Sequence, residues 1–218
     1  QTIAIGKLNV KICGSSSGLS DFGDGATHQC VEDMAIFRAV PNMTVICPAD
    51  ANETREAVKA IAQMKGPCYL RLNRNDYPNV TEEGARFEIG VPRILKHGTD
   101  VALFAAGYMT GVALEAAKEL EGSISVRVIN VSTIKPMNKE VMRKMAEGCR
   151  AVVTAEEHNV AGGLGSAVAE ALCEDPLPMK MVGIKDTFGC SGHNYQEVLA
   201  YHGLTKEAVA EAVRAMAG

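Results

Sequence analysis

Short apolar stretches rich in β-branched residues alternate along this chain with segments of helical periodicity, and this rhythm constrains the fold more than any other feature. A strand, a helix and a further strand in succession are typical of a parallel sheet with crossover helices. The sequence therefore predicts an α/β protein. The predicted strands are Lys7–Cys13, Thr44–Cys47, Cys68–Leu72, Val101–Ala105, Val126–Val131, Ala151–Ala155 and Met179–Ile184.

Helix signals between the strands support the same fold class. The best-defined helix begins at Asp50, a capping residue, with Glu53 in the position of a capping box, and Gly66-Pro67 ends it. One of its faces carries Ala57, Val58, Ile61 and Ala62. Further helices are predicted over Val31–Val40, around Val112–Leu120 and from a cap at Thr205 to Met216.

A polar stretch, Asn73–Gly90, divides this rhythm into two units. It contains Pro78 and shows no sustained period. We expect one domain over 1–75, a linker over 76–90 and a second domain over 91–218. Both are predicted as parallel-sheet units of three layers (αβα), the second complete, with four or five strands covered by helices on both faces.

The first unit contains three predicted strands, which is thin for a parallel sheet. The chain opens with Gln1 rather than Met and soon enters the apolar run Leu8–Cys13. We therefore expect the first unit to be truncated at its N-terminus, with upstream residues or a partner chain completing it.

Composition excludes several classes of partner. A formal net charge of -4 gives no basic field, so we expect neither nucleic acid nor an anionic membrane as a partner. No apolar run approaches the ~20 residues that a membrane span needs. The 7 cysteines include no C-x-x-C pair, which indicates neither a disulfide framework nor a zinc site and favours a reducing cytoplasm.

The densest polar cluster is Asp21–Gln29, between a predicted strand and a predicted helix. In an open α/β sheet, ligands bind outside the carboxyl ends of strands. Asp24 supplies an acceptor there and His28 a titratable donor. The alternative is a turn in which Asp24 and His28 cap the following helix.

Gly23-Asp24-Gly25 followed by Asn52 resembles the residues that hold Mg²⁺ on a diphosphate in thiamine-dependent enzymes. We expect no metal site here, because Asn52 falls inside the first turn of the capped helix rather than at a strand end.

Arginines stand at the end of the third predicted strand. Arg71 and Arg74 cannot both be buried without partners, and arginine at the carboxyl end of a strand suits a phosphate. The alternative is surface salt bridging to Glu32 or Asp33.

Two glycine-rich turns follow later strands. The glycines of Gly162–Ser166 do not have the spacing of a dinucleotide-binding motif. This segment is therefore interpreted as the tight start of a helix. Phe188–Gly192 is interpreted as a turn before a helix, without a base near Ser191 for nucleophilic catalysis.

Longer motifs carry a family resemblance. Gly23–Gln29, Arg38–Asp50 and Gly66–Arg74 resemble the second half of the pyrimidine-binding domain of transketolases. The transketolase C-terminal domain is similar to the later motifs Ile134–Pro136, Val153–Glu157, Gly162–Glu170 and Asp186–Gly192. The chain most resembles the C-terminal subunit of transketolases that are split into two chains.

The resemblance implies a cytoplasmic transferase of the pentose phosphate pathway that moves a two-carbon ketol unit between sugar phosphates on thiamine diphosphate. It implies that His28 binds the transferred unit near the reacting carbon, that Asp24 contacts a sugar hydroxyl and that Arg74 holds the phosphate. Ser16 stands where relatives often have a phosphate-contacting histidine. The expected partners are an N-terminal transketolase subunit or domain and further copies of this chain, as in a dimer.

Other family features are missing from this chain. The first glutamate is Glu32, downstream of the motif, and Phe22 is the only aromatic residue before it, so the glutamate and ring-stacking aromatics that activate the cofactor are absent. Mg²⁺ and the diphosphate belong to another domain or chain. We expect this chain alone to be inactive.

Two alternatives stay open. The first is a non-catalytic dimerisation or assembly module. The second is a related thiamine diphosphate enzyme, either a deoxyxylulose-phosphate synthase or the E1 β subunit of a 2-oxoacid dehydrogenase.

Overall fold

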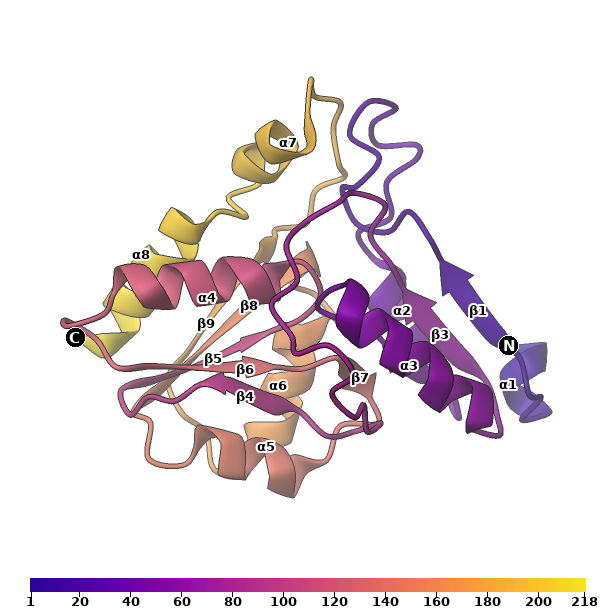
Figure 1. Cartoon of the computed structure of the whole chain (residues 1–218), viewed down its shortest axis with the longest axis horizontal. Coiled ribbons are helices and arrows are strands. Elements are labelled where there is room, and N and C mark those ends of the chain that lie inside the picture. Colours follow the sequence, from indigo (N-terminus) through magenta and orange to yellow (C-terminus); the bar gives the residue numbers. More distant parts are fainter.

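The computed structural model describes residues 1–218 and contains two sheets that lie side by side, flanked by helices (Figure 1). The first sheet has the strand order β1 (Lys11–Gly14), β3 (Cys68–Arg71), β2 (Thr44–Ile46) and β7 (Thr133–Lys135). The second has the order β4 (Arg93–Lys96), β6 (Val126–Asn130), β5 (Val101–Ala105), β8 (Ala151–Asn159) and β9 (Met179–Ile184). The predicted α/β class is confirmed.

Eight helices connect or flank these strands: α1 (Thr2–Ile5), α2 (Asp33–Ala39), α3 (Ala51–Gln63), α4 (Met109–Glu119), α5 (Lys139–Ala146), α6 (Leu164–Leu172), α7 (Tyr195–Tyr201) and α8 (Lys206–Ala217). The second sheet is covered by α4 and α8 on one face and by α5 and α6 on the other. This gives the predicted three-layer arrangement in the later half of the chain.

Neither sheet is parallel throughout, which corrects the sequence prediction. The strands β4 and β7 are antiparallel to β6 and β2 respectively. The prediction missed both because neither contains an apolar run: β4 has two apolar residues between charged ones, and β7 has one between a threonine and a lysine. The predicted strand at Lys7–Cys13 also begins too early, because Thr2–Ile5 forms α1 and the strand starts at Lys11.

The first sheet gains its fourth strand from the later half of the chain. Residues Val45 and Ile46 of β2 pair with Lys135 and Thr133 of β7. The expectation of a three-stranded sheet was therefore wrong, and part of the missing cover comes from this same chain rather than from upstream residues or a partner. On the opposite side β1 remains an edge strand.

The predicted cap of α3 is confirmed, but its capping box is altered. Asp50 Oδ1 accepts the Glu53 N–H at 2.9 Å. Instead of reaching the Asp50 N–H, the Glu53 carboxylate accepts the Ala49 N–H at 2.7 Å and the Asn130 amide at 2.9 and 3.0 Å. Glu53 thereby joins α3 to the second sheet.

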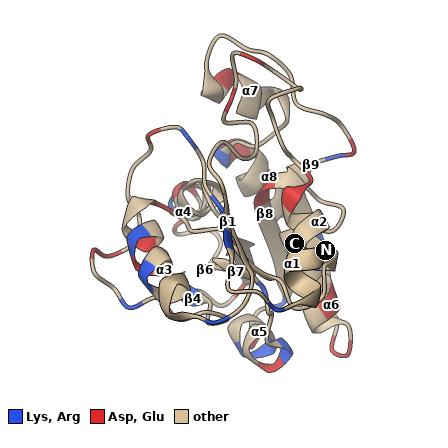
Figure 2. Ribbon diagram, turned by 90° about the vertical axis from the view of Figure 1, so that its right-hand side faces the viewer, with Lys and Arg blue, Asp and Glu red and all other residues tan.

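One core cluster spans both sheets. It joins Met34, Val45 and Tyr69 of the first half to Phe104 and Ile129 of the second. Burial of this shared apolar surface stabilises the two halves against each other. Figure 2 shows acidic and basic residues interspersed along helices such as α3 and α5 rather than gathered in one stripe. No helix is both long and apolar enough to cross a membrane.

Candidate active site

The predicted site residues lie on loops at one edge of the first sheet. The loop that follows β1 carries Ser16, Asp24 and His28, and the segment that follows β3 carries Arg74. Because β1 and β3 are parallel and adjacent, their carboxyl ends lie at the same edge, where α/β folds bind ligands. Figure 1 shows this loop at the top of the molecule.

Asp24 and His28 are exposed on the loop. The Thr27 hydroxyl lies 3.1 Å from His28 Nδ1. Neither side chain caps the following helix, because the N-cap of α2 is Glu32 and receives no side-chain cap. The alternative of a capping turn is therefore wrong, and both groups are accessible to a ligand.

Arg74 is held against the same loop by an ion pair. Its Nη1 donates to Asp21 Oδ2 at 2.8 Å, and 51% of the Arg74 side chain stays exposed. Arg74 also lines a hollow of about 370 Å³ between α3 and the segment after β3, together with Arg55 and Asn75. Ser16 is half-buried and does not line this hollow.

Arg71, the other arginine of the motif, has a structural role. It is buried, and its Nε donates to both carboxylate oxygens of Asp33 at 3.0 and 2.9 Å. The Tyr69 hydroxyl donates to the same carboxylate at 2.6 Å. Burial favours the neutral acid, but the Arg71 charge and the Tyr69 hydrogen bond outweigh it and hold the pKa of Asp33 below its usual range. The salt-bridge alternative is thus confirmed for Arg71 with Asp33, in the interior rather than on the surface.

Sequence reasoning missed the role of Glu157 at the end of β8. Its buried carboxylate accepts the Leu19 N–H at 2.6 Å and the Asn73 amide at 3.1 Å. Its carbonyl accepts from Arg71 Nη2 at 2.9 Å. Glu157 therefore fixes both segments that carry the candidate site. The available signal was the pair of acidic residues Glu156-Glu157 directly after the predicted apolar strand Ala151–Ala155, a pair that the structure places inside β8.

The neighbouring Glu156 binds the start of α6, and this contact confirms the tight helix start predicted for Gly162–Ser166. Its carboxylate accepts the Leu164 N–H at 2.6 Å and the Gly165 N–H at 2.8 Å. A Cβ at Gly163 would lie 2.0 Å from Glu156 Oε2, so only glycine fits. Burial raises the pKa of Glu156 to about 7. The N-terminus of α6 is filled by the protein's own carboxyl group.

Two further side chains named in the sequence analysis, Asn52 and Glu32, contact backbone groups. Asn52 lies in the first turn of α3, and its amide donates to the Thr81 carbonyl at 2.9 Å. Glu32, the first glutamate of the chain, accepts the Val31 N–H at 2.8 Å. Both side chains bind the protein's own backbone.

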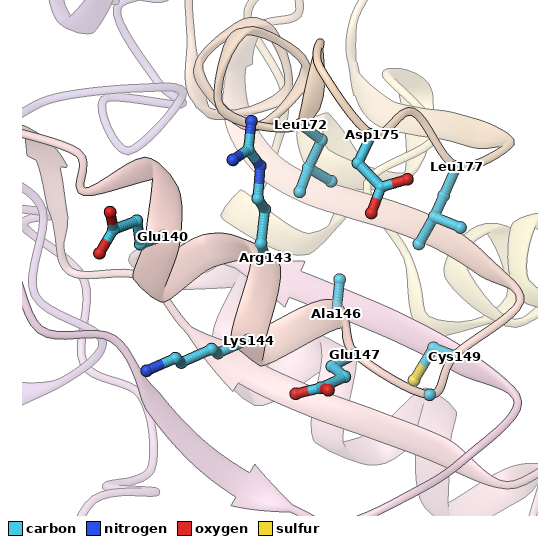
Figure 3. Close-up of a pocket in the computed structure, with 10 residues that line it drawn as sticks. Glu140, Arg143, Lys144, Ala146, Glu147, Cys149, Leu172, Asp175 and Leu177 are labelled. Atoms are coloured by element: carbon cyan, nitrogen blue, oxygen red, sulfur yellow. The ribbon is translucent and has the colours of Figure 1, made fainter.

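A larger hollow is elsewhere in the molecule. It measures about 500 Å³ and lies between α5 and the segment after α6. Figure 3 shows Glu140 and Lys144 pointing away from Asp175 and Leu177. Its polar groups do not converge on one point, and none of its residues is a predicted site residue.

Comparisons with known proteins agree with this architecture. The family model of the transketolase pyrimidine-binding domain matches residues 1–80, and that of the transketolase C-terminal domain matches residues 90–209. A candidate transketolase C-terminal section of Methanocaldococcus jannaschii is 43% identical over 97% of this chain and 67% of its own length. A subunit of the apulose-4-phosphate transketolase of Phocaeicola vulgatus is 38% identical over 95% of this chain and 67% of its own length.

A solved structure described as "Split gene transketolase, inactive beta4 tetramer" superposes with a TM-score of 0.91 at 45% identity, covering 99% of this chain and 69% of that one. The chain thus spans about two thirds of these relatives. It belongs to the transketolase family.

Proposed function

We propose that this chain supplies the sugar-phosphate side of a transketolase that transfers a two-carbon ketol unit between sugar phosphates, in the cytoplasm and within the pentose phosphate pathway. The observation that carries the proposal is the placement of the His28 loop and Arg74 at one sheet edge, joined by the ion pair between Arg74 and Asp21. A proton-sharing group and a phosphate-binding cation on neighbouring loops suit a phosphorylated sugar.

Each side chain has a role that fits its exposure. His28 binds the transferred unit next to the reacting carbon and acts there as a general acid or base. Asp24 accepts a hydrogen bond from a sugar hydroxyl. Arg74 binds the terminal phosphate through its guanidinium group, whereas Ser16 does not line the hollow beside Arg74 and receives no role in this proposal.

The residues present do not form a complete site for thiamine diphosphate. The carboxylate of Glu32 and the amide of Asn52 are both engaged with backbone groups, and Phe22 packs against the second half's core. We therefore assign the cofactor and its Mg²⁺ to another domain or chain, an N-terminal transketolase subunit. The similarity to an inactive tetramer of a split transketolase supports homo-oligomer formation and inactivity of the chain alone.

The role of Arg74 is tested in the assembled enzyme by comparing a phosphorylated donor with its unphosphorylated analogue. Arg74→Ala should raise KM for the phosphorylated donor by roughly ten- to a hundredfold and leave the analogue unchanged, because one charge-assisted hydrogen bond is lost. Arg86→Ala, an exposed arginine in the 76–90 segment, is the matched control. Equal weakening of both donors would make Arg74 structural and refute the phosphate assignment.

The assignment of the cofactor to another chain is tested by calorimetry. The isolated 218-residue chain should show no micromolar affinity for thiamine diphosphate with Mg²⁺ and should transfer no ketol unit, because general-base activation and orientation of the cofactor are missing. Micromolar or tighter binding by this chain would overturn it.

A further inference from the structure

A turn from the second half of the chain, 188–192, packs on the loop that carries His28. Figure 1 shows the segment before α7 beside the loop after β1 at the top of the molecule. The Gly192 N–H donates to the Phe22 carbonyl at 2.9 Å. A Cβ at Gly25 would lie 2.3 Å from the Ser191 hydroxyl oxygen, so the two segments are in direct contact.

One side chain joins these two segments. Gln29 is 9% exposed, and its Nε2 donates to the Cys190 carbonyl at 3.0 Å and to the Asp21 carbonyl at 3.1 Å. A third carbonyl, that of Leu19, lies at 3.5 Å. The amide therefore bridges the start of the loop, at Asp21, and the turn, at Cys190, and the hydrogen bond to Cys190 crosses the interface between the halves.

The other end of the Gln29 amide explains a glycine in the turn. Its Oε1 is buried without a hydrogen-bond partner and faces Gly189, where a Cβ would lie 1.7 Å from it. The unsatisfied oxygen has a cost. The amide therefore contributes to the contact with the turn through its donor side.

The bridge reaches both candidate site groups through Asp21. The Asp21 carbonyl also accepts the Gly25 N–H at 3.3 Å, and the Gly25 carbonyl accepts the His28 N–H at 2.9 Å. The Asp21 carboxylate binds Arg74. Movement of Asp21 would therefore displace the backbone of His28 and the guanidinium of Arg74 together.

We propose that Gln29 is a positioning residue through which the turn 188–192 of the second half holds the His28 loop in its working geometry. This rests on the proposed function of His28. It gives the second half of the chain an indirect part in the reaction, through the position of the His28 loop.

The test uses Gln29→Met in the assembled enzyme, because methionine keeps the length and volume but donates no hydrogen bond. Hydrogen exchange of the amides in 21–29 and 189–192 should become about tenfold faster through loss of the bridge. The kcat should fall about tenfold or more through misplacement of His28, with KM for an unphosphorylated donor unchanged. Gln63→Met, an exposed glutamine at the end of α3, is the matched control.

A role in packing alone predicts wild-type kcat for Gln29→Met and would overturn the inference, as would unchanged exchange in both segments. Faster exchange with wild-type kcat would also overturn it and leave the proposed function intact. Absence of activity in the wild-type assembly would instead defeat the proposed function, and exchange alone would then decide whether the bridge exists.

A second perturbation guards against misfolding of the first variant. Gly189→Ala pushes against Gln29 Oε1 from the other side and should give the same losses. Gln29→Ala combined with Gly189→Ala removes that collision, so the double variant should lose less than the sum of the single losses. Strict additivity would show that Gln29 and the turn act independently and would contradict the inference.

Discussion

The two sheets differ in how far their strands are buried and in how many of their faces are covered by helices. In the second sheet every residue of β5 is buried and helices cover both faces. In the first, no residue of β1 is fully buried, the strand is a free edge, and the fourth strand comes from the later half of the chain. The proposed chemistry is nevertheless carried by loops of the first sheet. Under the proposed function, the well-buried second half is the scaffold and the less buried first half carries the reactive groups.

The largest expected effect comes from breaking the ion pair inside the first sheet. Arg71→Met leaves the buried Asp33 carboxylate without its cation, which should lower the free energy of unfolding by about 3–5 kcal/mol. Arg74→Ala breaks an ion pair whose arginine is half exposed and should cost about 0–1 kcal/mol. Urea denaturation of both variants measures the difference, and equal losses would contradict the distinction between the two arginines.

A smaller effect tests whether the second half supports the first sheet. Ile134 of β7 is 1% exposed within the shared core cluster. Ile134→Ala should cost about 2–5 kcal/mol and should speed hydrogen exchange in β2, which is distant in sequence. Val58→Ala, at an exposed position of α3, serves as control. Loss of protection confined to the second sheet would show that β7 contributes little to the first.

The smallest expected effect is a pH dependence of the stability, caused by buried groups where the two halves meet. His158 is buried beside Asp33, Glu156 and Arg71. Burial, aided by the Arg71 charge, lowers its pKa from 6.5 to about 4. Its contribution to stability is therefore fully present above pH 6.5 and is lost as the pH falls through about 4.

The contribution of Glu156 to stability depends on pH in the opposite direction. Burial raises its pKa from 4.5 to about 7, so its contribution is fully present below pH 4.5 and is lost as the pH rises through about 7. His158→Gln should therefore lose less stability than the wild type on acidification from pH 6.5 to 4, while both weaken on approaching neutrality. The exposed control His97→Gln should follow the wild type. If the free energy of unfolding falls equally with pH in His158→Gln and the wild type, the lowered pKa of His158 is contradicted.

Local signals predicted the parts of the fold that depend on neighbours in sequence. Asp50 and Thr205 cap α3 and α8 as expected, because a cap requires only the residues within one turn. The pairing of β7 with β2 depends on contacts about 90 residues apart and could not be inferred from a three-residue strand. The exposed Val58 shows the same limit, since which face of α3 is buried depends on the sheet beneath it.

In the candidate site, too, features set by neighbouring residues were predicted and those set by distant contacts were not. The loop with Asp24 and His28 was found because its polar residues stand between a strand and a helix. The support from Glu157 and from the turn 188–192 comes from segments more than 130 residues away. Arg71 and Arg74 were alike in sequence, and only the position of Asp33 in the fold separates the buried pair from the exposed one.

The central claim is that the first half carries the reactive groups and the second half supports them. Its most direct test is the turnover of the assembled transketolase with His28→Ala, measured beside His97→Ala in the second half. If His28 shares the proton of the transferred unit, its removal should lower kcat by about 10²-fold or more. His97, exposed before β5, should leave kcat unchanged. Wild-type turnover by His28→Ala would contradict the account, because the reactive group would then lie outside the first half's loop.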